Sequence, residues 1–129
     1  AQAKFIYKKY EKINKEYQET LKRAIQHKTE EDILVYLYDH DRMSLNGDIA
    51  NELAYRFQDK VIIVGRKKSG EVRISFRGNN YNLPPMINKA LEGCKGYGGG
   101  HEHAAGGNIK EEDFPRFLEQ FKKEIKKSK

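Results

Sequence analysis

A single cysteine, Cys94, occurs among the 129 residues, so the chain has no pair of thiols for an internal disulfide. One thiol also excludes a zinc cage built from cysteines, and it fits a reducing compartment. No apolar run approaches the length of a membrane span, and no signal peptide is visible. We therefore expect a cytoplasmic protein that does not enter a membrane.

Clustered carboxylates and histidines are also scarce. Two-metal phosphodiester cleavage needs several of these groups to converge, whereas this chain offers only Asp39-His40-Asp41 in one place. If the preceding strand continues through this tripeptide, its side chains alternate between the two faces, so a closed three-ligand site is not expected. We predict no catalytic residue, no bound metal and no hydrolysis by this chain alone.

Positive charge is plentiful, and its distribution is uneven. The net charge is +6, and residues 1–29 carry eight Lys and Arg against three Glu. Residues 60–79 hold only Glu71 against six basic residues, which are Lys60, Arg66, Lys67, Lys68, Arg73 and Arg77. A basic block of this kind is a candidate footprint for a phosphate backbone. A solvated hairpin tip is the alternative, and it accounts better for Arg66 to Lys68 than for Arg77.

The length suits one domain, and the pattern of residues predicts an α/β fold with a mixed β-sheet flanked by helices. The expected order is helix, strand, helix, strand, strand, helix, glycine loop, strand, helix. Apolar residues recur every three or four positions over residues 2–27, which predicts one long helix. We interpret residues 1–29 as a connector helix and residues 30–129 as one domain. The absence of an initiator methionine leads us to expect a fragment of a longer protein.

The most unusual segment runs from Lys95 to Gly107, where six of thirteen residues are glycine. Such a density argues against a strand or a helix, and three consecutive glycines, Gly98, Gly99 and Gly100, favour a loop with positive φ. Bare backbone of this kind can aim successive N–H groups at one anion. His101 follows directly and can donate a further hydrogen bond to the same oxygens. The alternative is an ordinary glycine-rich surface turn.

A second constellation is predicted on the strand over residues 72–76. Alternation places Val72, Ile74 and Phe76 on one face, and Arg73, Ser75 and Arg77 on the other. A hydroxyl and guanidinium groups in one row suit the recognition of phosphate. If this strand ends beside the glycine loop, Ser75 and Arg77 share one phosphate site with Gly98 to Gly100.

These two constellations together resemble a known family. Gly-Gly-Gly-His at positions 98–101, followed by His-Ala-Ala-Gly-Gly at 103–107, resembles the signature of the DHH-associated C-terminal domain of the DHH phosphoesterases. That superfamily is named for an Asp-His-His metal motif and includes RecJ-like single-strand exonucleases, nanoRNases and cyclic dinucleotide phosphodiesterases. The resemblance spans roughly residues 31–125 and includes Ile-Ser-Phe-Arg at 74–77.

The resemblance implies a substrate-binding domain that holds single-stranded DNA or RNA, or a small nucleotide. Cleavage would belong to a separate N-terminal DHH catalytic domain that uses Mn²⁺ or Mg²⁺, which would make the parent protein a hydrolase. Carried over residue by residue, the resemblance implies substrate contacts by Ser75, Arg77 and the Gly-Gly-Gly-His segment. His103 belongs to the expected site as well, although its position varies in the family.

Two other functions stay open at this point. The C-terminal region of alanyl-tRNA synthetase resembles the same domain, so a tRNA-associated module is the alternative. A protein-interaction role is the third possibility, with a homodimer or a partner held through residues 1–27. His101 and His103 could also share a metal, although no third ligand lies nearby in the sequence.

Overall fold

The computed structural model describes the backbone of residues 2–39 and 44–129, and the side chains of residues 8–39 and 44–129. The helices are α1 (Gln2–Ile25), α2 (Asn46–Arg56), α3 (Leu83–Ala90) and α4 (Phe114–Lys127), with a short 3-10 helix over Glu111–Asp113. The strands are β1 (Ile33–Asp39), β2 (Val61–Lys68), β3 (Glu71–Arg77), β4 (Gly96–Gly100) and β5 (Ala104–Lys110). The predicted α/β fold with a long N-terminal helix is confirmed.

The five strands form one mixed sheet in the order β1-β2-β3-β5-β4. β1 and β2 are parallel because α2 crosses over between them, and the other neighbours are antiparallel. Ser69 and Gly70 both have positive φ, as a two-residue hairpin between β2 and β3 requires. β4 is an edge strand that pairs only with β5 within the part of the chain that is described.

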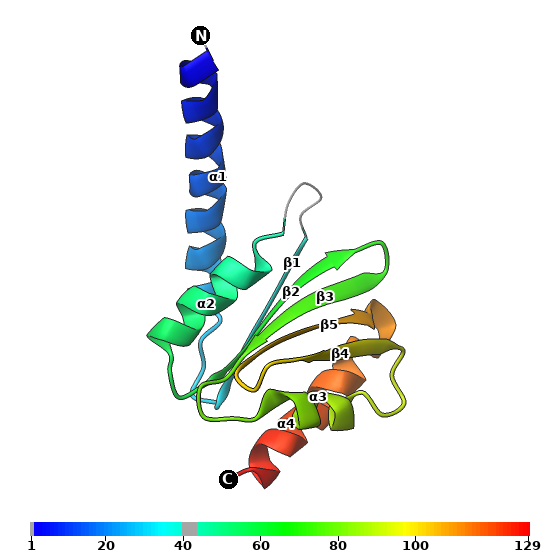
Figure 1. Cartoon of the computed structure of the whole chain (residues 1–129). Coiled ribbons are helices and arrows are strands. Elements are labelled where there is room, and N and C mark those ends of the chain that lie inside the picture. Colours follow the sequence, from blue (N-terminus) through cyan, green and yellow to red (C-terminus); the bar gives the residue numbers. More distant parts are fainter. Residues whose placement is uncertain (1, 40–43) are drawn as a thin grey trace.

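The two faces of the sheet are covered differently (Figure 1). We call the face under α3 and α4 the packed face, and it buries the side chains of Val72, Ile74 and Phe76 as predicted. Phe76 contacts the rings of Phe117 and Phe121 at centroid distances of 5.9 and 5.6 Å. We call the other face the open face, because α2 packs on β2 and β3 and leaves β5 and β4 beyond it.

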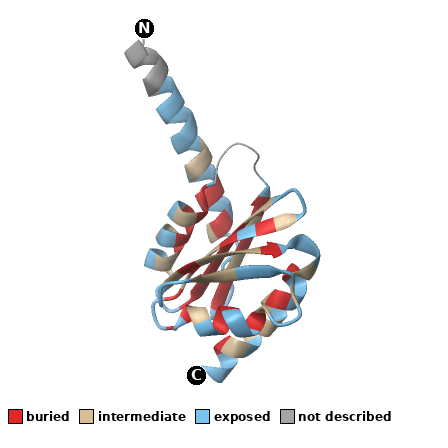
Figure 2. Cartoon of the chain, turned by 45° about the vertical axis from the view of Figure 1, so that its right-hand side comes forward, coloured by how far each residue is buried: buried red, intermediate tan, exposed pale blue. Residues whose placement is uncertain are grey.

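Helix α1 projects from this body (Figure 1), and only its last turns are packed. Leu21 and Ala24 are buried against the open face, whereas Tyr10 and Ile13 are exposed. Figure 2 shows the same contrast along this helix, which is coloured as buried only where it meets the rest of the chain. The predicted apolar stripe of the connector helix is therefore only partly covered by this domain. Contact of the remaining part of this stripe with a second copy of the chain or with a partner stays a prediction.

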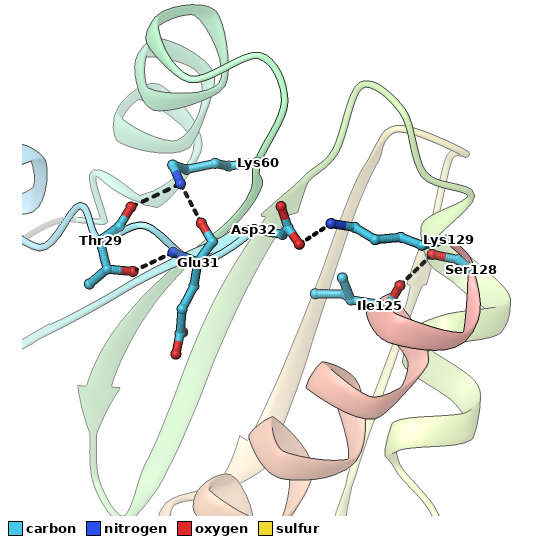
Figure 3. A network of polar contacts seen from close by, with 7 residues as sticks. All are labelled: Thr29, Glu31, Asp32, Lys60, Ile125, Ser128 and Lys129. Atoms are coloured by element: carbon cyan, nitrogen blue, oxygen red, sulfur yellow. Dashed lines mark hydrogen bonds and ion pairs between the residues drawn. The ribbon is translucent and has the colours of Figure 1, made fainter.

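Two contact networks hold the start of β1 (Figure 3). Lys129 forms an ion pair with Asp32, which ties the end of the chain to this strand. The ammonium of Lys60 donates hydrogen bonds to the carbonyl oxygens of Thr29, at 3.0 Å, and Glu31. Lys60 is buried and fully engaged, so its assignment to an accessible basic block is wrong.

The predicted glycine loop is also wrong, because this segment forms the hairpin of β4 and β5. The strand expected after the glycine loop is β5, and it begins within the glycine segment at Ala104. Only Gly100 has a positive φ within this segment, at 142°. Glycine is unfavourable in an isolated strand, but pairing with β3 and packing against α3 outweigh that preference here.

Candidate functional site

A groove of about 420 Å³ lies on the open face between the N-terminal end of α2 and the glycine hairpin. Asn46 and Gly47 of α2 form one wall, and the hairpin forms the floor and the other wall. Its lining is completed by Ser44, Arg73, Ile74, Ser75, Tyr97, Gly98, Gly99, Gly106, Gly107 and Asn108. The groove thus joins segments that lie far apart in the sequence.

Buried hydrogen bonds position the helix wall of the groove. The hydroxyl of Tyr38 donates to Asn46 Oδ1 at 2.6 Å, and Asn46 Nδ2 donates to the carbonyl of Arg73 at 2.7 Å. The same hydroxyl accepts from the Leu45 N–H at 3.0 Å, and burial raises the pKa of Tyr38. These bonds attach the start of α2 to β1 and β3, so this wall is rigid.

The first amides of α2 provide positive charge at this wall. Leu45 occupies the N-cap position and offers no side-chain hydrogen bond to the first turn. The N–H groups of this turn therefore lack partners within the helix, and the helix dipole adds partial positive charge at the same end. The exposed carboxylate of Asp48 in the same turn offsets part of this charge. Since Asn46 and Gly47 line the groove, an anion bound there would meet these groups.

The floor of the groove is bare because glycines alternate between the two faces of the hairpin. Gly99 pairs with Gly106 on the open face, and a Cβ added at Gly99 would meet no atom within 4 Å. Gly98 faces α3, where an added Cβ would lie 2.8 Å from Ile87 Cγ2. Gly107 is equally confined, since its Cβ would lie 2.7 Å from the carbonyl oxygen of Tyr97.

The backbone N–H groups of the hairpin glycines do not converge on one point as predicted. His101 and Ala104 exchange both backbone hydrogen bonds, and the antiparallel alternation then assigns Gly98 and Gly100 to pairs without hydrogen bonds. Their N–H groups point to the free edge of β4. These glycines therefore present N–H groups along a strand edge, and they do not form a concave nest.

Arg77 lies under α2 and is not a free outward-facing residue, which corrects the sequence-based expectation. Its Nε donates to Asn51 Oδ1 at 2.7 Å, and its Nη1 donates to the carbonyl of Phe76 at 2.8 Å. The side chain is half-buried, and this burial lowers the pKa of the guanidinium. Arg77 does not line the groove, whereas Ser75 of the same row does.

The two histidines of the hairpin turn have different surroundings. Nδ1 of His103 lies 2.9 Å from the carbonyl oxygens of both Gly78 and Tyr81, so this ring ties the turn to the segment before α3. The side chain of His101 is exposed and has no hydrogen bond among the described residues. Neither histidine lines the groove itself.

Residues 2–39 and 44–129 contain no group of three His, Cys, Asp or Glu side chains placed to hold a metal ion. The candidate tripeptide Asp39-His40-Asp41 lies partly outside the described residues, because these exclude 40–43. Carboxylate and imidazole ligands for Mg²⁺ or Mn²⁺ are therefore not assembled in the described part of this chain. None of its described helices has the length and apolar character to cross a membrane.

Sequence reasoning missed several groove residues. Tyr97 is 66% exposed on the open face of β4, and Asn108 pairs with Tyr97 across the hairpin. Tyr97 could have been found from the sequence, because it is an aromatic residue within a run of glycines and belongs to no apolar pattern. Asn46 gave no signal, because its role depends on contacts with Tyr38 and Arg73 that are remote in sequence.

The chain matches a known protein family. Residues 30–127 match the DHHA1 domain. No curated protein matches the sequence at a significant level.

Several solved structures share the fold. RecJ from Thermus thermophilus, in complex with Mg²⁺, aligns with a TM-score of 0.72 at 17% identity, over 86% of this chain and 17% of that chain. The C-Ala domain of Aquifex aeolicus alanyl-tRNA synthetase gives 0.58 at 19% identity, over 74% of this chain and 94% of that domain. A pGpG-specific phosphodiesterase, PggH from Vibrio cholerae, gives 0.62 at 16% identity, over 91% of this chain and 40% of that one.

Proposed function

This chain belongs to the DHHA1 domain family, and we propose that its groove holds the phosphates and a terminal nucleotide of a single-stranded nucleic acid or oligonucleotide. Cleavage would be carried out by a separate, metal-dependent DHH catalytic domain. The chain spans only 17% of the RecJ structure and 40% of the pGpG-specific phosphodiesterase, so substrate and activity are proposals for the whole protein. Its single cysteine supports a cytoplasmic location.

The observation that carries this proposal is the groove itself. It combines a floor without side chains, first-turn amides of α2 that have no partner within the helix, and hydroxyl and guanidinium groups from Ser75 and Arg73. Bare backbone allows a phosphate to approach closely, and the amides and cations favour its charge. Tyr97 adds an exposed aromatic face on which a base can stack.

Replacement of Tyr97 tests the groove directly. Stacking of one base on an aromatic ring contributes about 1–3 kcal/mol, so Tyr97→Ala should weaken binding of a labelled short single strand by about 5- to 150-fold. Tyr55 is the matched control, because it is 74% exposed on α2 and lies outside the groove. Fluorescence anisotropy measures both variants. Equal affinities for Tyr97→Ala and Tyr55→Ala would contradict the proposal.

Substitutions of the two histidines distinguish the effect of the hairpin turn on binding from its effect on stability. His101 has an exposed side chain without a hydrogen bond to the described residues, so His101→Ala should leave folding unchanged. Although His101 does not line the groove, its side chain is free to contact a substrate that extends over the hairpin turn, so His101→Ala should weaken binding. His103→Ala should weaken binding less, but it removes the contacts with Gly78 and Tyr81. Equal losses of affinity in the two variants, together with a gain in affinity on addition of Mn²⁺ that only the wild type shows, would indicate a shared metal instead.

A tRNA-associated role is the second candidate, because this chain aligns with nearly all of the C-Ala domain. The two candidates differ in the preferred competitor. Under the leading proposal, a short single strand displaces the labelled ligand at least as well as a structured tRNA does. Much stronger competition by the tRNA would reverse the order.

A further inference from the structure

We propose that the tip of the β2–β3 hairpin carries a second phosphate site, formed by Arg66, Arg73 and Lys68, which continues the groove. The ligand would then be a single strand that extends beyond a dinucleotide. This inference rests on the proposed function of the groove, and it adds the class of substrate that the domain selects.

Strand register brings these cations together on the open face. Arg66 of β2 is directly opposite Arg73 of β3, in line with the pair of Val64 and Ser75 on the same face. A hollow of about 300 Å³ lies over them, lined by Arg66, Lys68, Ser69, Glu71, Arg73 and Asn108. Since Arg73 and Asn108 line the groove too, the two hollows are contiguous.

The charge of this hairpin tip is only partly compensated within the described residues, because one carboxylate, Glu71, lies opposite Lys68 and also acts on Arg73 and Lys110. Neither Arg66 nor Arg73 forms a salt bridge there, and Arg66 Nε is buried without a hydrogen-bond partner. Glu71 is the acidic residue of the hollow, and its two oxygens accept from Asn108 Nδ2 at 2.9 Å and Lys110 Nζ at 3.2 Å. Like charges directly opposite each other destabilise a sheet, so an anionic ligand would relieve the pair.

Of the six basic residues at positions 60–79, only those of this site stay available on the open face. Lys60 is buried at the other end of β2, Arg77 is bonded beneath α2, and Lys67 alternates to the packed side of the strand. What stays on the open face is Arg66, Lys68 and Arg73. Arg73 lines the groove at this end, and Arg66 and Lys68 lie beyond it.

The length of the combined surface explains why a dinucleotide would not fill it. Val64 of β2 lies opposite Ser75, and Lys68 lies four residues further along β2, which is about 13 Å. The groove already reaches Arg73, which lies opposite Arg66, so Lys68 lies two residues, or about 7 Å, beyond it. A strand whose end is held over Gly99 would therefore bring later phosphates to the arginine pair and to Lys68. A small nucleotide held in the groove would not reach Lys68.

The test compares two labelled ligands of the same base composition, a dinucleotide and a twelve-nucleotide single strand, across a range of salt concentrations. Arg66→Gln and Lys68→Gln should each weaken binding of the twelve-mer by about tenfold and flatten its log–log salt slope by about 0.7. Binding of the dinucleotide should stay within twofold. Lys123→Gln is the matched control, because Lys123 is an exposed lysine of α4 on the packed side.

Failure of this inference differs from failure of the proposed function. If wild-type protein binds both lengths equally and Arg66→Gln behaves as Lys123→Gln does, the second site is refuted while the groove stands. If neither ligand binds, or Tyr97→Ala has no effect on either, the groove itself is refuted, and the second site with it. Lys68 is exposed, so Lys68→Gln gives the answer even if Arg66→Gln perturbs folding.

Discussion

The two faces of the β4–β5 hairpin use the same residue type for opposite purposes. On the packed face, Gly98 and Gly107 are glycines because α3, β3 and the neighbouring strand leave no room for a side chain. On the open face, Gly99 has empty space above it, and glycine there keeps the groove floor clear. Adjacent glycines of one motif thus serve packing and ligand access in alternation.

This difference teaches that a glycine-rich signature need not be a flexible loop. The period of two that separates core and surface positions in any strand also separates these glycines. A substitution on one face should therefore act on stability, and one on the other face on binding. Gly107→Ala and Gly99→Ala test this division in the hairpin, and changes at Arg77 and Glu71 then test how the neighbouring strand β3 is held, from the largest expected effect to the smallest.

Gly107→Ala should give the largest loss of stability. Its new Cβ would lie 2.7 Å from a backbone oxygen that cannot rotate away, and overpacking of this kind costs about 1–3 kcal/mol. Gly99→Ala is the control, because its Cβ meets nothing and should change the free energy of unfolding by less than about 0.5 kcal/mol. Urea denaturation of both variants measures the contrast. Similar losses for both would contradict the division between the faces.

Arg77→Ala should have an intermediate effect that reports on how α2 is attached to the open face. It removes the bonds to Asn51 and Phe76, and since the group is only half-buried we expect a loss of about 1 kcal/mol. Arg77→Lys should recover part of it. Arg73→Ala, in the same row of β3 but exposed, should leave stability unchanged or slightly raised. If Arg73→Ala destabilised the protein as much, the special role of Arg77 would be disproved.

Glu71 should give the smallest effect, and that effect should depend on pH. Hydrogen bonds from Asn108 and from Lys110 lower the pKa of Glu71 below its ordinary value. A carboxylate with a lowered pKa in the folded state contributes stability above its unfolded pKa, and this contribution is lost as the pH falls through the folded pKa. The wild type should exceed Glu71→Gln in urea midpoint at pH 7, and the gap should close below about pH 4.

The control for this measurement is Glu112→Gln, which removes an exposed carboxylate without an ion pair in the described structure. Parallel pH profiles for the two variants would show that the bonds to Asn108 and Lys110 do not matter for stability.

Sequence reasoning succeeded where a local pattern carries the information. The alternation of Val72, Ile74 and Phe76 predicted both the strand and its buried face, and the three- and four-residue spacing over residues 2–27 predicted α1. It failed at Gly96–Gly100, because residues without side chains carry no periodic pattern. It also failed for Lys60 and Arg77, whose charges predicted exposure although remote carbonyl and amide oxygens bind them.

By itself, the sequence determined the fold class, the face of β3 that is buried, and the family, since each depends on residue types at short and regular spacing. The tertiary structure alone decided that the glycines form paired strands, because β5 gains its hydrogen bonds from β3, which is remote in sequence. It also decided which cations are free. Arg66 and Arg73 become neighbours through strand register, whereas Lys60 and Arg77 are held by hydrogen bonds that only the folded chain can form.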